Sequence, residues 1–476
     1  MARYDFDLIV IGCGGAGITA ATLASGLGKK TAMVDKKRFG GECTWTGCVP
    51  SKALIQSARM AYRAGNTGIY GLELKGKFTV KRGRVMESVR GVVDAVYKGE
   101  ERKRFESLGI TAIENADVRF EDPHTLRVSG EKMTSSKFLI STGSGPLIPP
   151  IKGMDKARVL TNETLFSLKK LARSMIILGA GPIGVEMAMA LNRLGVKVTL
   201  VEMGPEILPR EDREIAGMLA EVMKREGVNI LTGARAVQVS GAGKVALSYE
   251  SDGALRKTAA DSLLVAVGRR PHTGGLNLEA AGVLHDSRGV AVNRYLQTSA
   301  QNIYAAGDVV GPYQFSHIAN YQAIVATSNA LLPLKRRVSY EHVAWCIFTD
   351  PELARSGMTE QEAVDRFGGA LRVYRVPYGS IDRAATDRAH AGLAKFICSA
   401  DGTILGVHIL GERAGELLHE PHAAKSMGIK LHKLNSVIHV YPTYNDIIRI
   451  AARQAYIDKI RRTLIVRLVK LLRRGK

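Results

Sequence analysis

The chain has 476 residues, of which 46% are apolar and 24% are charged, and its formal net charge is +22. This length predicts about three domains, and the balanced composition excludes a disordered, fibrous or disulfide-framework protein. So basic a chain would suit nucleic acid, but it carries no zinc finger, RNA-binding signature or basic region with interleaved aromatic residues, so we predict no nucleic-acid partner.

The N-terminal stretch MARYDFDLIVIGCGGAG contains a short apolar run that follows two aspartates and leads into glycines. This pattern predicts a first β-strand rather than a signal peptide. Elsewhere no apolar stretch approaches the roughly 18 residues that a membrane span needs. The five cysteines, at 13, 43, 48, 346 and 398, are too few and too uneven for a structural disulfide framework. They favour a reducing, cytoplasmic compartment, in which any disulfide is catalytic.

The first strand runs into Gly12, Gly14 and Gly17, which have the spacing GxGxxG. A helix rich in small residues follows, and then a second strand that ends at Asp35. The glycines allow a tight turn and let a pyrophosphate approach the N-terminus of the helix, and the acid accepts hydrogen bonds from ribose hydroxyls. Strand, helix, second strand and terminal acid together predict a dinucleotide site.

The stretch GGECTWTGCVPSK, residues 40–52, places Cys43 and Cys48 five positions apart. Further along the chain, STGSGPLIPP at 141–150 and VAVGRRP at 265–271 each resemble a strand that ends in glycine and proline. We interpret these two stretches as the crossings between two domains. After the second crossing, Asp308 follows a strand and small residues, where it is well placed to bind a ribose or a polyol.

The dinucleotide pattern recurs between the two crossings. Gly179, Gly181 and Gly184 lie between a strand and a helix, and the next strand ends at Glu202. One chain therefore holds two dinucleotide sites. A carboxylate at position 202 suits the free 2′-hydroxyl of NADH and repels the 2′-phosphate of NADPH, although Arg210 lies near enough to offset this.

With these motifs in place, the chain resembles the FAD-dependent pyridine nucleotide-disulfide oxidoreductases, which include dihydrolipoamide dehydrogenase, glutathione reductase and mercuric reductase. The similarity covers nearly the whole chain. The motifs that carry it are GCGGAG with Asp35, CTWTGC with PSK, STGSGP, GAGPIGVE, AVGRRP, NIYAAGDV, CIFTDPELARSG and HVYPTYND.

The resemblance implies an α/β fold of two doubly wound dinucleotide-binding domains, one inserted in the other, and a C-terminal α+β dimerisation domain. The FAD domain would cover 1–150 and 270–338, the NAD(P)H domain 151–269 and the interface domain 339–455, with a basic tail at 456–476. Two subunits would pair, and each active site would be completed by the C-terminal segment of the partner.

The resemblance also implies which residues bind and react. The cofactors would be FAD and NADH, the latter preferred over NADPH. The cofactor-binding positions would be Gly12, Gly14, Ala16, Gly17, Asp35, Lys36, Gly41, Glu42, Cys43, Thr142, Gly143, Gly179, Gly181, Ile183, Gly184, Glu202, Gly268, Gly307, Asp308 and His317.

For catalysis, Cys43 and Cys48 map onto the redox-active disulfide of the family. Cys48 would be the thiolate in charge-transfer contact with the flavin, and Cys43 the thiol that meets the substrate. Lys52 and Glu186 correspond to an ion pair that the family holds near the flavin. The start of a helix favours the thiolate form of a cysteine. Cys13, Cys346 and Cys398 have no such context and are predicted to be core thiols.

One departure from the family lies in IHVYPTYND, near the C-terminus. Disulfide-reducing members carry a histidine where this chain has Tyr441 and a glutamate where it has Asp446, while His439 stands two residues before the tyrosine. Histidine titrates near 6.5 and tyrosine near 10, so Tyr441 is a poor base at neutral pH. Tyrosine at this position is a feature of mercuric reductases, but the chain has no cysteine after 398 to deliver a metal ion.

The final segment, 456–476, combines Ile457, Ile460, Leu464, Leu468 and Leu471 with many basic residues. These spacings predict a cationic amphipathic helix. It would pack on the interface domain or on the partner subunit, or it would attach the enzyme to the inner face of an anionic membrane.

Three functions follow from these patterns. The first is an NADH-dependent flavoprotein that passes electrons through Cys43 and Cys48 to a disulfide or thiol-type substrate, in the manner of dihydrolipoamide dehydrogenase. The second is a reductase of mercury or another soft metal ion, for which the same two cysteines would be the metal-binding residues; no other metal site is predicted. The third is a membrane-associated NADH-dependent flavoprotein or a redox-responsive binding protein.

Overall fold

A computed structural model describes residues 4–76, 78–157, 159–241 and 243–462. The chain forms two compact units, which are described separately. Unit 1 comprises Met1–Leu178, Gln238–Ala246 and Ala259–Ser339, and unit 2 comprises Gly179–Val237, Leu247–Thr258 and Tyr340–Lys476. Three of the boundaries between the units, at 238, 247 and 259, fall inside the strands β12 (Arg235–Ser240), β13 (Val245–Ser251) and β14 (Ala254–Ala260).

Unit 1 is built on a seven-stranded sheet of order β3-β2-β1-β6-β5-β4, in which β19 also pairs with β6. The parallel strands are β1 (Phe6–Ile11), β2 (Thr31–Val34), β3 (Thr111–Ile113), β6 (Glu131–Ile140) and β19 (Ile303–Ala305). The strands β4 (Val118–Asp122) and β5 (Thr125–Val128) extend the sheet in antiparallel fashion. The apolar run of β1 is buried because layers cover both faces of a parallel sheet.

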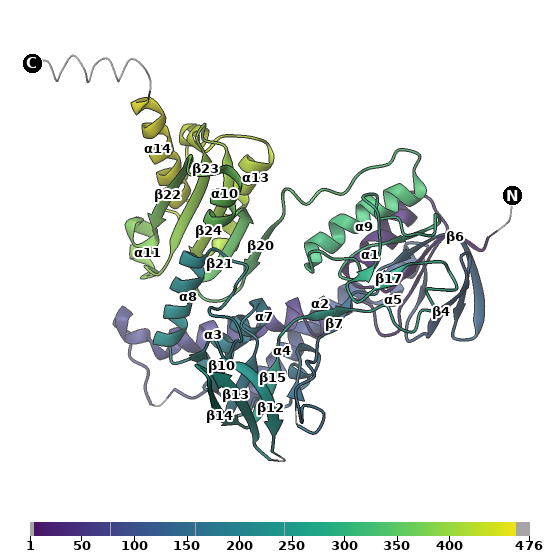
Figure 1. Cartoon of the computed structure of the whole chain (residues 1–476), viewed down its shortest axis with the longest axis horizontal. Coiled ribbons are helices and arrows are strands. Elements are labelled where there is room, and N and C mark those ends of the chain that lie inside the picture. The colour runs from purple at the N-terminus through teal and green to yellow at the C-terminus, as the bar shows by residue number, and fades with distance from the viewer. Residues whose placement is uncertain (1–3, 77, 158, 242, 463–476) are drawn as a thin grey trace, which may run out of the picture. The chain divides into compact units, whose positions relative to one another are not determined.

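The helices α1 (Gly15–Gly26) and α9 (Ser316–Leu331) lie side by side against this sheet (Figure 1). Unit 1 also contains α2 (Gly41–Trp45), α3 (Cys48–Gly65), α4 (Arg82–Tyr97), α5 (Arg102–Ser107) and α6 (Asn162–Leu165), together with the parallel strands β8 (Val159–Leu160), β9 (Ser174–Leu178) and β15 (Ser262–Val265). The predicted crossings become β7 (Ser144–Pro146) and β16 (Arg269–Pro271), which pair in antiparallel fashion. A short hairpin joins β17 (His285–Asp286) and β18 (Gly289–Val290).

Unit 2 begins at the second glycine turn and holds α7 (Pro182–Arg193), β10 (Lys197–Val201), α8 (Arg213–Arg225) and β11 (Asn229–Leu231). Its antiparallel sheet has the order β20-β21-β24-β23-β22, formed by β20 (Ala344–Ile347), β21 (Glu352–Gly357), β22 (Leu371–Pro377), β23 (Leu393–Ser399) and β24 (Ile404–Gly411). The helices α10 (Glu360–Phe367), α11 (Asp382–Thr386), α12 (Ala414–Leu417), α13 (His419–Ser426) and α14 (Asp446–Arg461) accompany it. The parallel sheets and the antiparallel C-terminal sheet confirm the predicted fold class.

Two polar side chains lie inside the antiparallel sheet, where most neighbours are apolar. Lys395 is 2% exposed on β23, and His408 is fully buried on the adjacent β24. The Nε2 atom of His408 lies 2.8 Å from the carbonyl oxygen of Met358, and its Nδ1 atom has no hydrogen-bond partner among the described residues. Burial lowers the pKa of His408 from 6.5 to about 4, and Asp212, Arg355 and Lys395 are the charged groups near it.

This histidine predicts an acid-sensitive fold. The unfolded chain takes up the proton near pH 6.5, whereas the folded chain resists protonation until about pH 4. The contribution of His408 to the free energy of unfolding should therefore be fully present above pH 6.5. It should be lost as the pH drops toward 4, which lowers the free energy of unfolding by on the order of 3 kcal/mol. Thermal unfolding at pH 7 and pH 4.5 checks this. From pH 7 to pH 4.5, the melting temperature of His408→Gln should decrease much less than that of the wild type. Equal decreases in the two proteins would contradict the prediction.

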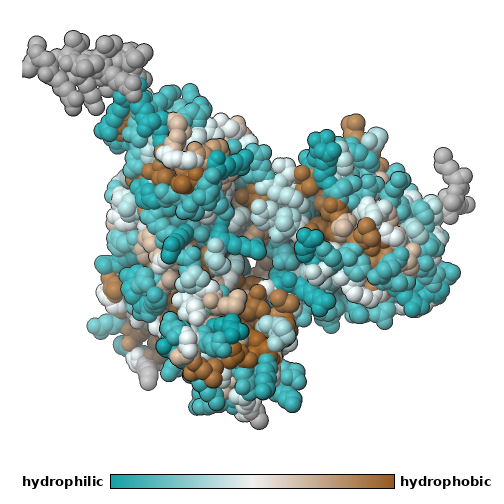
Figure 2. All heavy atoms as spheres, viewed as in Figure 1, coloured by the Kyte–Doolittle hydropathy of each residue, from teal (hydrophilic) through white to brown (hydrophobic). Residues whose placement is uncertain are grey.

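The face of the molecule in Figure 2 is mostly hydrophilic, with separate hydrophobic patches. Within the described ranges, no helix is both long enough and apolar enough to cross a membrane. The predicted tail helix falls largely on residues 463–476, outside the described residues. Its first part belongs to α14, on which Tyr456, Ile457 and Ile460 are each more than a third exposed.

Candidate functional site

The first glycine turn is shaped for close backbone approach. A Cβ at Gly17 would lie 1.9 Å from the carbonyl oxygen of Gly12, and Gly12 itself has φ +93°. Only glycine fits either place. The turn therefore leaves the N-terminus of α1 open to a phosphate group, as the pattern GxGxxG predicts.

Asp35 follows β2 and is tied to this turn. Its Oδ2 atom accepts a hydrogen bond of 2.6 Å from the Cys13 N–H, and its Oδ1 atom accepts one of 2.7 Å from the Lys37 N–H. Burial raises the pKa of Asp35. The neighbouring Lys36 points to solvent and pairs with Asp117 at 3.6 Å. The carboxylate is thus held at the turn, where a ribose would lie.

A second group of predicted residues lies just after the ends of the paired strands β6 and β19. Asp308 accepts a hydrogen bond of 2.7 Å from the Ser144 hydroxyl, and the N–H of Gly307 donates to Gln322 at 2.7 Å. The Thr142 hydroxyl donates to the carbonyl oxygen of His272 at 2.7 Å. These contacts fix a carboxylate and a glycine-lined backbone on one side of unit 1.

The two predicted redox cysteines meet directly. The Cys43 thiol, in α2, interacts with the thiol of Cys48, which is the first residue of α3. That contact is the largest cause of a raised pKa for Cys43, followed by burial. The Cys48 Sγ atom also lies 3.5 Å from the Ser316 hydroxyl. When one thiol of such a pair ionises, the other keeps its proton, and the start of a helix favours the thiolate at Cys48.

Two glycines, Gly14 in the first glycine turn and Gly41 beside the dithiol, let these two segments approach each other closely. A Cβ at Gly41 would lie 2.5 Å from the Cα of Gly14, and Gly41 has φ +60°. The segment that carries Cys43 can therefore pack backbone to backbone against the glycine turn. Both features of the first site, the turn and the dithiol, lie together in unit 1.

Glu42, next to Cys43, is held by side chains from distant segments. Its carboxylate binds the guanidinium of Arg269, including a contact of 2.6 Å from Nη1, and accepts from Asn162 at 2.6 Å. Arg269 also donates to Ser144 and lies 3.6 Å from Asp308. The arginine therefore bridges the dithiol segment and the carboxylate predicted to bind a polyol.

Lys52 lies on α3 in unit 1, one helical turn beyond Cys48. Glu186 lies on α7 in unit 2, where its Oε1 atom accepts a hydrogen bond of 2.9 Å from the Phe348 N–H. The predicted pair of Lys52 and Glu186 spans the two units and stays a prediction. His317, on α9, stacks on Phe315 with ring centroids 5.4 Å apart.

The second glycine turn repeats the first. A Cβ at Gly184 would lie 1.9 Å from the carbonyl oxygen of Gly179, whereas one at Gly181 would meet open space. Ile183 follows in the first turn of α7. The Glu202 carboxylate accepts hydrogen bonds from the N–H groups of Ala180 at 2.7 Å and Gly204 at 2.8 Å. A second carboxylate is thus fixed at the end of a strand beside a second turn.

The C-terminal residues pair differently from the family pattern. The Tyr441 side chain is exposed, and its hydroxyl donates to Asp382 at 2.7 Å, which raises the pKa of Tyr441. The His439 side chain is 3% exposed and contacts Glu420 at 2.9 Å through Nε2. Asp446 accepts instead from Arg449 at 2.7 Å. The structure therefore gives His439 a carboxylate partner, but that partner is Glu420.

Comparison with known proteins decides the family. The pattern of the pyridine nucleotide-disulphide oxidoreductases matches residues 6–327, and that of their dimerisation domain matches residues 343–452. The chain belongs to this family. As a family member it is a flavoprotein disulfide reductase, and its dimerisation domain supports a homodimer.

The relatives of this oxidoreductase have different substrates. It is 33% identical to a mercuric reductase of Staphylococcus aureus, over 94% of this chain and 82% of that protein. It is 34% identical to a dihydrolipoyl dehydrogenase of Thermus scotoductus, over 93% and 95% of the two chains. Among solved structures it is similar to the Cu(II) complex of the HOCl-induced flavoprotein disulfide reductase RclA from Escherichia coli, with a TM-score of 0.83, 29% identity, and 95% and 100% coverage.

The family implies FAD and NAD(P)H, and the residues of this oxidoreductase fit both. In the two turns, Gly17 and Gly184 are too crowded for a side chain, and each turn has a carboxylate at the end of the next strand. Asp35 and Glu202 would hold the two ribose hydroxyls, and Asp308 the flavin polyol. In the described part of this oxidoreductase, no group of three or more His, Cys, Asp or Glu is arranged to hold a metal ion.

Sequence reasoning missed three residues of the site: Arg269, Asn162 and Ser316. Each lies more than 100 residues from its partner beside the dithiol. Arg269 belongs to the AVGRRP motif, so its place at a crossing was a usable signal. Asn162 and Ser316 carry no local pattern that indicates their contacts.

Proposed function

We propose that the chain is an NADH-dependent oxidoreductase that passes electrons through Cys43 and Cys48 to a sulfur-bound acceptor. The observation that carries this proposal is the direct contact of the two thiols at the start of α3, in the same unit as the first dinucleotide turn. FAD, when bound, takes two electrons from the nicotinamide and hands them on. Reduction of the disulfide to a Cys43 thiol and a Cys48 thiolate consumes two electrons and one proton, and Cys43 then meets the acceptor.

NADH is the proposed donor because of Glu202. Its carboxylate is already fixed by two backbone N–H groups and would repel a 2′-phosphate. The exposed Arg213, which follows in the same segment, is paired with Glu206 at 3.2 Å. We further propose that the chain is divided as the sequence predicts. FAD would bind to residues 1–150 and 270–338, NADH would bind to residues 151–269, and residues 339–455 would form the dimer interface.

The acceptor class that the C-terminal geometry favours is a thiol-bound soft metal ion, such as mercuric or cupric ion. In the family, the segment around Tyr441 of the partner subunit would meet the thiols. Tyr441 is exposed but has a raised pKa, and His439 is shielded from solvent. Such a site suits ligand exchange among soft thiolates more than proton transfer. A mercuric reductase and a copper-bound RclA structure among the relatives support this class.

A disulfide acceptor such as lipoamide is the second candidate. The pairing of His439 with Glu420 favours it, because a carboxylate that holds an imidazole is the arrangement a general base needs. The dihydrolipoyl dehydrogenase relative supports the same class.

The test compares acceptors for the FAD-loaded dimer with NADH. Mercuric ion in excess thiol, or cupric ion without added thiol, should give a kcat/KM about tenfold or more above that of lipoamide or glutathione disulfide, a difference of about 1.4 kcal/mol. Tyr441→His should narrow this gap by supplying an exposed imidazole for disulfide reduction. Preferred use of lipoamide, lost in His439→Gln, would contradict the metal assignment and favour the second candidate.

For the location of the enzyme, we propose the cytoplasm and a place at the inner face of the membrane. Residues 453–476 contain nine Lys or Arg and a single Asp, and each basic residue near an anionic surface contributes about 1 kcal/mol. The exposed apolar residues at the end of α14 would add insertion. The full-length protein should float with anionic vesicles at low salt and dissociate at high salt. Failure to float at low salt would refute membrane binding.

A further inference from the structure

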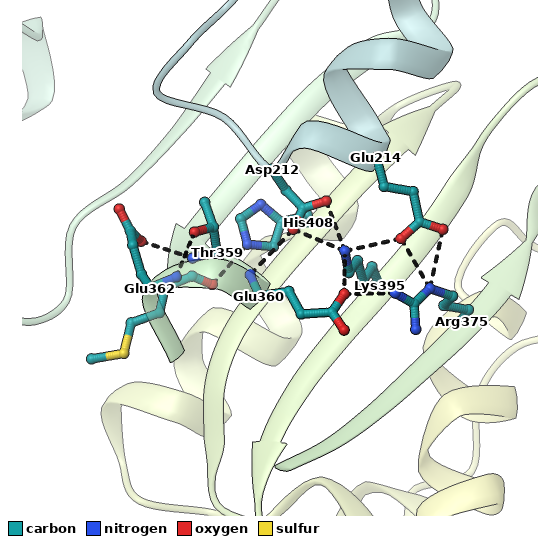
Figure 3. A network of polar contacts seen from close by, with 9 residues as sticks. Asp212, Glu214, Thr359, Glu360, Glu362, Arg375, Lys395 and His408 are labelled. Carbon is teal, nitrogen blue, oxygen red and sulfur yellow. Dashed lines mark hydrogen bonds and ion pairs between the residues drawn. The ribbon is translucent and has the colours of Figure 1, made fainter. Parts of the chain in front are cut away.

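A buried lysine in unit 2 holds three carboxylates. The Lys395 side chain is 3% exposed, and its Nζ atom lies 2.8 Å from Asp212, 2.9 Å from Glu214 and 2.7 Å from Glu360 (Figure 3). Arg375, on the neighbouring strand β22, binds the same two glutamates. Asp212 occupies the residue just before α8, and Glu214 lies in the first turn of that helix. Two cations of the antiparallel sheet therefore hold the start of α8.

Two further side chains of this sheet bind the residues just before α8. The Trp345 indole donates to Glu211 at 2.8 Å. The Arg355 guanidinium donates to the carbonyl oxygen of Arg210 and lies over the Trp345 ring, 4.8 Å from its centroid. Three consecutive residues, 210–212, thus each receive a hydrogen bond from a side chain of the C-terminal sheet.

The same segment returns to the second glycine turn. The N–H of Glu211 donates to the carbonyl oxygen of Leu208 at 2.9 Å, and the N–H of Leu208 donates to that of Ala180 at 2.9 Å. Leu208 is buried and has φ +51°, so its backbone has little freedom. Ala180 in turn binds the Glu202 carboxylate. An unbroken series of contacts joins Lys395 to the turn and the carboxylate proposed to bind NADH.

We propose that Lys395 is a positioning residue for NADH. By holding Asp212, Glu214 and Glu360 together, it fixes the segment 203–212 against the glycine turn, and so sets where Glu202 meets the adenosine ribose. Without the ammonium group, the buried carboxylate of Asp212 would lose its cation. Glu214 and Glu360, which are about a third exposed, would keep only Arg375. The uncompensated buried charge would move the start of α8. The inference rests on the proposed use of NADH as the electron donor.

The test measures NADH binding separately from chemistry, by anaerobic reduction of the bound flavin at increasing NADH concentrations. In Lys395→Met the apparent Kd for NADH should rise about tenfold, while the limiting rate of reduction stays within about twofold of the wild type. The preference for NADH over NADPH should also shrink. Lys224→Met is the matched control, because Lys224 is an exposed lysine on α8, the helix whose start Lys395 holds, and it pairs with Glu221 at 2.9 Å. It should change neither value.

A milder variant covers the case in which Lys395→Met does not fold. Trp345→Phe removes the indole hydrogen bond to Glu211 and keeps a ring beneath Arg355, so it should raise the Kd about threefold. An unchanged Kd in a folded, FAD-loaded variant, or a fall in the limiting rate alone, would overturn the role of Lys395. A wild type that NADH does not reduce would instead refute the proposed function, and this inference with it.

Discussion

Replacing Cys48 with serine should lower turnover with any sulfur-bound acceptor by about a thousandfold or more, while NADH still reduces the bound flavin. Cys43 and Cys48 contact each other, and an electron pair can be stored between them only as the difference between a disulfide and a dithiol. A serine hydroxyl cannot form that bond. Cys43→Ser should cause a loss of the same size, because the two thiols act as one unit.

Cys346→Ser is the matched control. Cys346 lies on β20, and its thiol is directed to the carbonyl oxygen of Ile347. It is outside the proposed relay, so its replacement should leave turnover within about twofold of the wild type. Steady-state NADH oxidation with the preferred acceptor measures all three variants. Near-normal turnover in Cys48→Ser would show that electrons bypass the dithiol.

Gly17→Ala should abolish FAD binding. The new methyl group would lie 1.9 Å from the carbonyl oxygen of Gly12, far inside van der Waals contact, so the turn or the start of α1 must shift. A shift of the backbone there removes the N–H groups that would face the pyrophosphate. The purified variant should contain little or no FAD and should not oxidise NADH.

Gly26→Ala provides the control within the same helix. A Cβ at Gly26 meets no atom within 4 Å, and alanine favours helix over glycine by about 1 kcal/mol. This variant should keep its FAD and melt at the same temperature as the wild type or higher. Equal FAD content in the two variants, measured by absorbance after denaturation, would contradict the assignment of the turn.

Much of the fold was predictable because its local patterns are strong. The apolar run of β1 is buried on both faces. Glycine is required at 17 and at 184 because a Cβ there would lie 1.9 Å from the carbonyl oxygen of Gly12 or of Gly179, and both of those glycines have a positive φ. Each of these features depends on neighbours within a few residues or on a strand–turn–helix unit. For this reason the sequence indicates them without knowledge of the tertiary structure.

The rest of the site could not be predicted because it depends on long-range packing. His439, in the loop before α14, contacts Glu420 on α13, whereas the resemblance to the family placed Asp446 at the position of the family's glutamate. Lys395 looks like an ordinary alternating strand residue in the sequence, yet it is buried among carboxylates from α8 and α10. Such contacts arise from the order of strands in a sheet, which local spacing does not encode.

Anaerobic reduction of the FAD-loaded wild type with NADH, beside Cys48→Ser, tests the central claim most directly. The account predicts that reduced wild type shows a long-wavelength absorption band from a thiolate beside the flavin and exposes two new reactive thiols per subunit. Cys48→Ser should show neither, although its flavin is reduced. Bleaching of the wild-type flavin without the band or the thiols, with reoxidation only by oxygen or a quinone, would contradict a relay through Cys43 and Cys48.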